Sequence, residues 1–158
     1  MDIRSATLKD IDLIKEYRTK VSTQTEYMNN PSKEKIKETL EIYINDKNKF
    51  YFIVIKDEEI IGLYCYYINK EKSTLHIDHI SVIQLMYGTG LSKQLMEIME
   101  KEGKKEHIEI LELIVHRDNI RGIMFYEKLG YKLVREAKHI LTYRKMLNIH
   151  KRHSLENW

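Results

Sequence analysis

The chain has 158 residues, of which 42% are hydrophobic and 32% are charged, a balance that suits one compact domain with a hydrophobic core. A single cysteine, Cys65, excludes an intramolecular disulfide, and the longest apolar stretch, residues 60–68, is far shorter than the roughly 20 residues of a membrane-spanning helix. The first ten residues are charged and lack the apolar segment of a signal peptide, so we expect a cytoplasmic protein without a membrane partner.

The formal net charge is only +3, but basic residues gather toward the C-terminus. They are Lys132, Arg135, Lys138, Arg144, Lys145, Lys151 and Arg152. This stretch lacks the interleaved aromatic and basic residues, and the signature motif, of an RNA-binding surface, which favours a solvated basic face over a nucleic-acid interface. We predict a single domain over residues 1–148 and a short basic tail over residues 149–158.

Hydrophobic periodicity in the first half of the chain predicts strands and two helices. Asp10 is placed to cap a helix whose apolar positions recur up to Val21, and Pro31 and Ser32 open a second helix. β-Branched and aromatic content predicts the strands, two of which form a hairpin around a turn at residues 57–59. The predicted strands of this half span residues 2–6, 50–55, 60–68 and 74–82.

The second half alternates helices and strands. A helix with an apolar stripe begins at Leu91 and is predicted to end at Gly103, and a second helix begins after Asn119 and ends before Gly130. The predicted strands span residues 108–115, 131–135 and 140–146. The whole order, β-α-α-β-β-β-α-β-α-β-β, indicates an α+β or mixed α/β sheet and not a Rossmann domain.

A glycine turn joins the strand ending at Val82 to the helix beginning at Leu91. Residues 87–92 read YGTGLS, which lacks the Gly-Lys-Ser/Thr of a P-loop and the third glycine of a dinucleotide-binding turn. Exposed backbone N–H groups at a helix N-terminus favour phosphate. A purely structural turn explains the same glycines, so the turn alone leaves both interpretations open.

Two motifs in the right order resemble those of the GNAT superfamily of acetyl-CoA-dependent N-acyltransferases, over residues 3 to about 147. The family loop Gln/Arg-Gly-x-Gly-x-Gly/Ala falls on residues 87–92, where Tyr87 and Ser92 are the departures. The family pattern Asn-x-x-Ala-x-x-x-Tyr-Glu-x-x-Gly-Phe is met, with Gly and Tyr substituted at its fourth and last positions, by Asn119, Gly122, Tyr126, Glu127, Gly130 and Tyr131.

The resemblance implies a GNAT-like acyl-CoA N-acyltransferase fold whose sheet opens between the fourth and fifth strands to admit acetyl-CoA. It implies direct transfer of an acetyl group, through a ternary complex, to a primary amine on a small molecule or peptide. The residues that it places at the acetyl-CoA are Ile80, Ser81, Val82, Tyr87, Gly88, Thr89, Gly90, Leu91, Ser92, Asn119 and Tyr126.

Catalytic roles follow from the same resemblance. Tyr126 matches the tyrosine that meets the CoA sulfur, and a phenol can share its proton with the departing thiolate. His76 and Asp78 lie two residues apart on a strand and so share one face, whereas His79 points to the other; the pair could serve as base and orienting or substrate-binding carboxylate. A packed tyrosine, a structural histidine and a helix-capping Asn119 are the alternative interpretations.

The acceptor and the assembly stay open at this level. Residues 17–43 offer groups that could suit a polyamine, an amino sugar or a peptide terminus, although surface helices look the same: Glu26, Tyr27, Glu34, Glu38 and Tyr43. No histidine or cysteine pair has metal-ligand spacing, so we expect no metal. A longer acyl group, a homodimer, a catalytically weak acyl-CoA-binding regulatory module, and a basic nucleic-acid or protein-binding domain are the alternatives.

Overall fold

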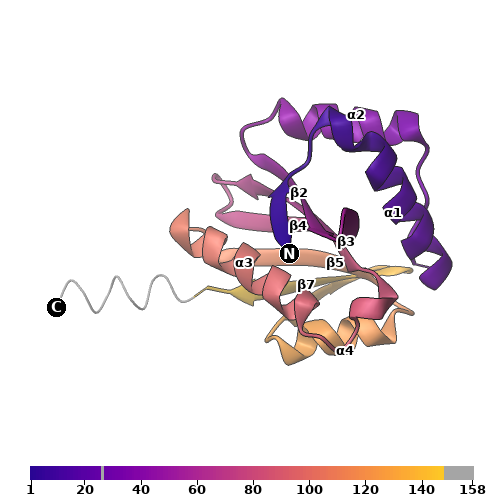
Figure 1. Cartoon of the computed structure of the whole chain (residues 1–158). Coiled ribbons are helices and arrows are strands. Elements are labelled where there is room, and N and C mark those ends of the chain that lie inside the picture. The colour runs from indigo at the N-terminus through magenta and orange to yellow at the C-terminus, as the bar shows by residue number, and fades with distance from the viewer. Residues whose placement is uncertain (26, 148–158) are drawn as a thin grey trace. The chain divides into compact units, whose positions relative to one another are not determined.

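The computed structural model describes residues 1–25 and 27–147 (Figure 1). Contacts divide the chain into two compact units, the first made of Met1–Tyr67 and His79–Leu95, the second of Ile68–Asp78 and the chain from Met96 onward. The predicted domain boundary at residue 148 therefore stays a prediction, and the predicted tail at residues 149–158 lies outside the described residues.

The elements in chain order are β1 (Asp2–Ser5), η1 (Leu8–Asp10), α1 (Ile11–Gln24), α2 (Lys33–Ile44), β2 (Lys49–Lys56), β3 (Glu59–Asn69), β4 (Thr74–Val82), η2 (Gln84–Met86), α3 (Leu91–Lys105), β5 (Ile110–His116), α4 (Ile120–Lys128), β6 (Lys132–Glu136) and β7 (Ile140–Met146).

This order confirms the predicted mixed sheet with its succession of helices and strands; the short 3₁₀ helices η1 and η2 are the additions. In the first unit the strand order is β1-β2-β3-β4. β1 and β3 both run antiparallel to β2, with Ile3 opposite Val54 and Ile53 opposite Leu63. The hairpin turns at Asp57 and Glu58, whose φ angles of 52° and 66° are left-handed; a two-residue connection of this kind matches the right-handed twist of the flanking strands.

Helices α1 and α2 cover the buried face of the β2–β3 hairpin in the first unit (Figure 1). The residues of this core are Ala6, Ile14, Tyr17, Val21, Ile36, Leu40, Tyr43, Tyr51, Ile53, Ile60, Leu63 and Cys65. The helical residues among them recur at intervals of three, four or seven, so each helix presents one apolar stripe to the strands. The stripe leaves Arg18, next to Tyr17, half-buried at its edge.

Asp10 occupies the N-cap position of α1, as predicted, but its side chain makes no capping hydrogen bond there. The helical path begins one turn earlier, at η1, where the Thr7 hydroxyl accepts a hydrogen bond from the Lys9 amide at 3.2 Å. The Asp10 carboxylate instead accepts from the Thr7 amide at 2.8 Å and from the Arg4 guanidinium at 2.8 and 2.9 Å. These bonds, Arg4 first, outweigh burial and hold the pKa of Asp10 below its ordinary value. A capping box at Thr7 has therefore replaced the expected cap.

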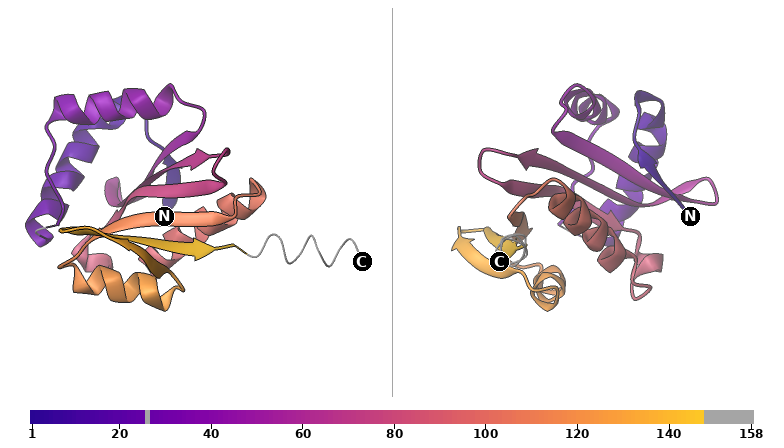
Figure 2. Two further views of the ribbon diagram at one scale, coloured as in Figure 1. Left: turned by 180° about the vertical axis from the view of Figure 1, so that it is seen from behind. Right: turned by 90° about the vertical axis from the view of Figure 1, so that its left-hand side faces the viewer.

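In the second unit the strand order is β4-β5-β7-β6. β4 and β5 pair in parallel from Thr74 opposite Ile110 to Ile77 opposite Leu113, although β5 itself continues to His116. β7 pairs antiparallel with β5 on one side and with β6 on the other. Helix α4 lies beside the β6–β7 hairpin, in orange and yellow in Figure 2.

The prediction that Gly103 ends α3 is wrong, because the helix continues to Lys105. A Cβ at Gly103 would lie 3.2 Å from Leu147 Cδ1 and 3.5 Å from Leu111 Cδ2, so the glycine permits close packing of α3 in the second unit. Two residues beyond the end of the helix, His107 has a left-handed φ of 59°, and the Ile108 amide donates to the Gly103 carbonyl at 2.8 Å. This is a Schellman ending with histidine where glycine is usual.

Within residues 1–25 and 27–147, no helix combines the length and apolar character needed to cross a membrane.

Candidate functional site

The residues predicted to bind acetyl-CoA or to act in catalysis fall in both units, and each group is described within its own unit. The first unit holds Ile80, Ser81, Val82, Tyr87, Gly88, Thr89, Gly90, Leu91 and Ser92. The second unit holds His76, Asp78, Asn119 and Tyr126.

The glycine turn owes its glycines to backbone conformation. Gly88 and Gly90 have φ angles of 79° and 86°, in the left-handed region that disfavours side chains. A Cβ at either position would meet no atom within 4 Å. Steric crowding therefore does not explain these glycines, and the open space above the backbone would let a ligand approach closely.

The turn leaves several backbone donors unpaired at the start of α3. The Tyr87 amide donates to the Gln84 carbonyl at 3.0 Å and the Thr89 amide to the Met86 carbonyl at 3.2 Å. The helix ladder begins when the Gln94 amide donates to the Gly90 carbonyl at 3.0 Å. Within the turn and the first residues of α3, the amides of Gly88, Gly90, Ser92 and Lys93 have no acceptor among the described residues. Unpaired donors at the positive end of a helix dipole form an anion-binding site.

This pattern narrows the predicted set of donors. The Tyr87 amide, which the sequence offered as a phosphate donor, is occupied within the turn. The Leu91 amide donates to the Thr89 hydroxyl at 3.4 Å, and this hydroxyl donates to the Met86 carbonyl at 2.6 Å. Thr89 therefore shapes the turn, and Lys93 contributes an amide that the motif did not indicate.

Ser81 joins a hydrogen-bonded chain in the first unit that sequence reasoning missed. Its Oγ lies 2.7 Å from the Tyr17 hydroxyl and 2.8 Å from Nε2 of His79. Burial, followed by the charge of Arg18, lowers the pKa of His79 to about 3, and burial raises the pKa of Tyr17. His79 is therefore neutral at physiological pH, and the Ser81 side chain is engaged with its neighbours; Ile80 is half-buried and Val82 is buried.

His76 is held by a carboxylate in the second unit. Its Nδ1 lies 2.8 Å from Oε1 of Glu112, and Oε2 of Glu112 accepts from Nε of Arg144 at 2.7 Å. Asp78 lies on the same side of β4, with Oδ1 3.9 Å from Nε2 of His76, as the spacing predicted. Because the Glu112 carboxylate can only accept, Nδ1 of His76 carries the hydrogen and donates it in this hydrogen bond, and the neutral ring has its lone pair on Nε2.

Glu112 is held in its charged form by Arg144 and His76. Burial alone would raise the pKa of the Glu112 carboxyl, but the hydrogen bonds and charges of these two partners together outweigh burial, so the pKa lies below its ordinary value. Glu112 stands directly opposite His76 in the β4–β5 register. A glutamate within the apolar strand IEILELIV was the sequence signal for it, but only pairing identifies its partner.

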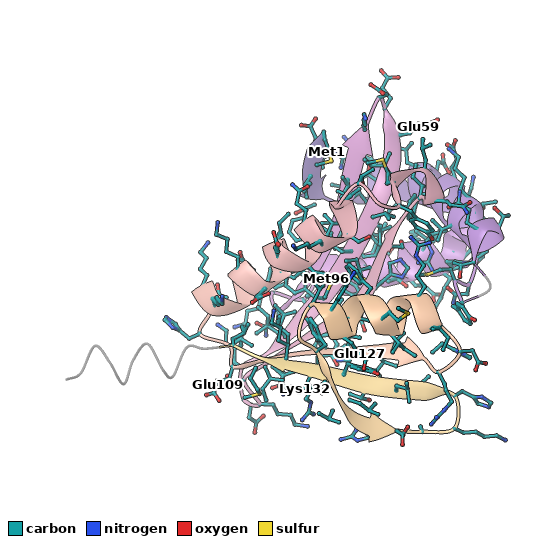
Figure 3. The ribbon with its side chains drawn as sticks, turned by 90° about the horizontal axis from the view of Figure 1, so that it is seen from below. Met1, Glu59, Met96, Glu109, Glu127 and Lys132 are labelled. Atoms are coloured by element: carbon teal, nitrogen blue, oxygen red, sulfur yellow. The ribbon has the colours of Figure 1, made fainter. Side chains whose placement is uncertain are left out.

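Helix α4 carries Asn119 and Tyr126 in the second unit. Asn119 caps the helix, its Oδ1 accepting from the Gly122 amide at 3.0 Å, and a Cβ at position 122 would lie 2.6 Å from the Asn119 side-chain nitrogen. Tyr126, which precedes the labelled Glu127 in Figure 3, makes edge contacts with the rings of Phe125 and Tyr131. Burial raises the pKa of Tyr126 to about 12, so its hydroxyl stays protonated at neutral pH.

The acidic residues suggested for an amine acceptor lie at the surface. Glu34 and Glu38 are exposed, and Glu38 makes an ion pair with Lys35 at 3.8 Å. Tyr43 is buried against Tyr51, Tyr27 is half-buried, and Glu26 lies outside the described residues. Within the part of the chain that the structure describes, no group of three or more histidine, cysteine or acidic side chains could hold a metal ion.

The sequence profile of the acetyltransferase (GNAT) family matches residues 15–131. The uncharacterized protein YxbD of Bacillus subtilis (strain 168) is 30% identical over 94 residues, a match that covers 60% of this chain and 57% of that relative.

Two solved structures have the same fold at low sequence identity. The PaiA N-acetyltransferase of Thermoplasma acidophilum, solved in complex with coenzyme A, is 20% identical, covers 92% of this chain and 98% of its own, and has a TM-score of 0.78. An acetyltransferase from Thermus thermophilus is 18% identical, covers 92% and 96%, and has a TM-score of 0.81.

Replacing Glu112 with glutamine is expected to lower the free energy of unfolding at pH 7 by about 1–2 kcal/mol, because the ion pair with Arg144 is lost. Since the folded-state pKa of Glu112 is depressed, its contribution is present above its unfolded pKa of about 4.3 and is lost as the pH falls. Urea unfolding of Glu112→Gln should therefore converge with the parent in acid. Glu97→Gln, at an exposed position of α3, is the control; parallel curves at all pH values would contradict the assignment.

Proposed function

Because the chain belongs to the acetyltransferase (GNAT) family, we propose that it is an N-acetyltransferase that moves the acetyl group of acetyl-CoA directly to a primary amine within a ternary complex. The observation that carries the proposal is the glycine turn before α3, with unpaired amides at Gly88, Gly90, Ser92 and Lys93. These donors would hold the pyrophosphate of acetyl-CoA. The coenzyme A bound in the Thermoplasma acidophilum structure supports this choice of acyl donor.

The reaction needs a neutral amine, which attacks the thioester carbonyl carbon. A C–N bond forms, the C–S bond breaks, the nitrogen loses a proton and the CoA thiolate leaves. We assign the amine proton to Nε2 of His76, because the Glu112 carboxylate on Nδ1 fixes the tautomer and stabilises the charged ring. Asp78, 3.9 Å from that nitrogen, would orient the ring or the ammonium form of the acceptor.

Tyr126 would stabilise the leaving thiolate. Its pKa of about 12 keeps the hydroxyl protonated, and among the described residues this hydroxyl has no hydrogen-bond partner. Because a thiol, with a pKa of about 8.5, is more acidic than this phenol, Tyr126 would act mainly by donating a hydrogen bond. The developing oxyanion would be met by the main-chain amide of Ile80 or Val82.

We place the reaction in the cytoplasm, which agrees with the single, buried, reduced Cys65. Asn119 would contribute to acetyl-CoA binding only through its helix cap, since its Oδ1 already accepts from Gly122. The acceptor would be a small molecule or a peptide amine. Acetyl-CoA binding without transfer to any amine would instead favour a regulatory acyl-CoA-binding module, and salt-dependent retention of nucleic acid without CoA binding would favour a basic binding domain.

Gly90→Val is expected to weaken acetyl-CoA binding by about tenfold to a hundredfold, because a β-branched residue is strained at a φ of 86°. Isothermal titration calorimetry measures the effect. Gly90→Asn is the matched control, since asparagine tolerates left-handed backbone and should bind more tightly than the valine variant. Equal affinity of a folded Gly90→Val variant and the parent would remove the turn from the acetyl-CoA site.

Tyr126→Phe is expected to slow acetyl transfer by about tenfold to a thousandfold while leaving acetyl-CoA affinity nearly unchanged, because only the donor hydroxyl is lost. Release of free thiol under single-turnover conditions measures the chemical step. Tyr131→Phe is the control, since it also deletes a buried hydroxyl, one without a partner among the described residues. If both variants react at the parent's rate, Tyr126 serves packing only.

His76→Gln is expected to flatten the rise of kcat/KM with pH, because glutamine keeps a hydrogen bond to Glu112 but cannot take up a proton. Asp78→Asn should raise the acceptor KM. His116→Gln is the control: His116 lies at the end of β5 and its Nδ1 accepts from the Asp118 amide at 3.1 Å. An unchanged pH profile in His76→Gln would assign deprotonation to water or to the acceptor itself.

A further inference from the structure

Arg18 is a half-buried cation on α1 of the first unit. Its Nη2 donates to the side-chain and main-chain oxygens of Asn29, at 2.5 and 3.3 Å, in the connection between α1 and α2. Both of these acceptors are neutral. Among residues 1–25 and 27–147, no carboxylate forms an ion pair with Arg18.

The guanidinium also keeps a donor unused. Nε of Arg18 is buried and has no hydrogen-bond partner in the described part of the chain. An unpaired buried donor is costly, and more so when the group is charged. Arginine presents its donors as a planar fork that matches a carboxylate. Because Nε itself is shielded from solvent, an anionic oxygen would approach the exposed part of the half-buried Arg18 side chain and compensate its charge.

The groups around Arg18 are polar but uncharged. Its charge lowers the pKa of His79 below what burial alone would give, and it opposes the rise that burial causes in the pKa of Tyr51. A hydrogen bond of 2.8 Å joins His79 to the Ser81 hydroxyl, and a second of 2.7 Å joins that hydroxyl to Tyr17. Neutral imidazole and phenol groups can donate to an anion, but they cannot neutralise a guanidinium. The cluster keeps a net positive charge.

The cluster adjoins the segment that leads into the glycine turn, all within the first unit. Tyr87, which opens the turn, acts electrostatically on the Tyr17 hydroxyl, and the Gln24 side chain at the end of α1 accepts from the Gln84 amide at 2.8 Å. A hollow of about 510 Å³ at this end of α1 is lined by Ser22, Thr23, Gln24, Thr25 and Tyr27. Ser22 lies one helical turn after Arg18, and the volume suits a small molecule.

We propose that Arg18 binds a carboxylate of the acceptor, so that the preferred acceptors are amino carboxylates, such as amino acids or the C-terminal ends of short peptides. The inference rests on the proposed function, since it names the acceptor class of that reaction. Arg18 acts electrostatically on Tyr17 and His79, whose hydrogen-bonded chain through Ser81 is largely buried. In such a water-poor setting an ion pair with a ligand is stronger than in water.

The proposal departs from a polyamine acceptor, which the acidic residues of α2 had suggested. Glu34 and Glu38 are exposed, and an exposed charge attracts a cation only weakly. Arg18, half-buried and without a counterion among the described residues, would repel a second ammonium group. The buried cation thus outweighs the surface acids in deciding which acceptor is accommodated.

The test uses matched probes that differ only in the far group: 5-aminopentanoate, 5-aminopentanamide and 1,5-diaminopentane. Calorimetry on the full chain saturated with coenzyme A measures binding without turnover. The carboxylate should bind about tenfold to a hundredfold more tightly than the amide, the range expected for hydrogen bonds to a charged group. Glycylglycine and glycylglycinamide repeat the comparison for peptide-like acceptors.

Arg18→Gln should abolish the preference for the carboxylate and leave amide binding unchanged, and Arg18→Lys should retain part of it, because lysine keeps the charge without the fork. Lys20→Gln, at a partly exposed position of the same helix, should change neither. Thermal unfolding shows whether each variant is folded. If Arg18→Gln does not fold, the carboxylate preference of Arg18→Lys is the test of the proposal.

Equal binding of carboxylate and amide by the parent, or an unchanged preference in the Arg18 variant that decides, would overturn the proposal. Acetyl transfer to 1,5-diaminopentane as fast as to 5-aminopentanoate would also overturn it while upholding the acetyltransferase. An Arg18-dependent preference measured with coenzyme A, in a protein that acetylates no amine, would support the anionic subsite and contradict the proposed reaction.

Discussion

Polar side chains on the largely buried strand β4 require hydrogen-bond partners, and this requirement organises the candidate site. A buried polar group without a partner is costly, so each one fixes the residues that face it. Ser81 is satisfied by Tyr17 of α1 and by His79, and His76 is satisfied by Glu112 of β5, which Arg144 of β7 holds in turn. In each unit, elements that are distant in sequence are thereby held by hydrogen bonds to particular side chains of β4.

The two histidines of β4 differ because of these partners. His76 faces a carboxylate that stabilises a protonated ring, whereas His79 faces a hydroxyl and lies near the guanidinium of Arg18, which opposes protonation. Identical side chains three positions apart are thus suited to different tasks. His76 is hydrogen-bonded to an anionic partner, and His79 is a neutral hydrogen-bonding group.

In the proposed function, anion recognition in the first unit would come from two kinds of donor. The glycine turn offers main-chain amides, whose direction is set by the left-handed angles of Gly88 and Gly90 and by the start of α3. Arg18 offers a charged side chain whose position is set by Asn29 and by its burial beside Tyr17. The amides suit a phosphate group of the acyl donor, and the guanidinium suits a carboxylate of the acceptor.

The sequence by itself determined the order of elements and the glycine turn, because both depend on local physics: periodicity places helices and strands, and a positive φ selects glycine. Local inference missed that the Asp10 side chain pairs with Arg4 and does not cap α1, and it erred at Gly103, which packs near Leu147 and Leu111. The same-side placement of His76 and Asp78 was local and correct. Tyr17 and Arg18 in the first unit, and Glu112 and Arg144 in the second, were linked to the predicted residues of their own unit only by the tertiary structure. Strand register and helix packing, which no short stretch of sequence encodes, decide which buried polar groups meet.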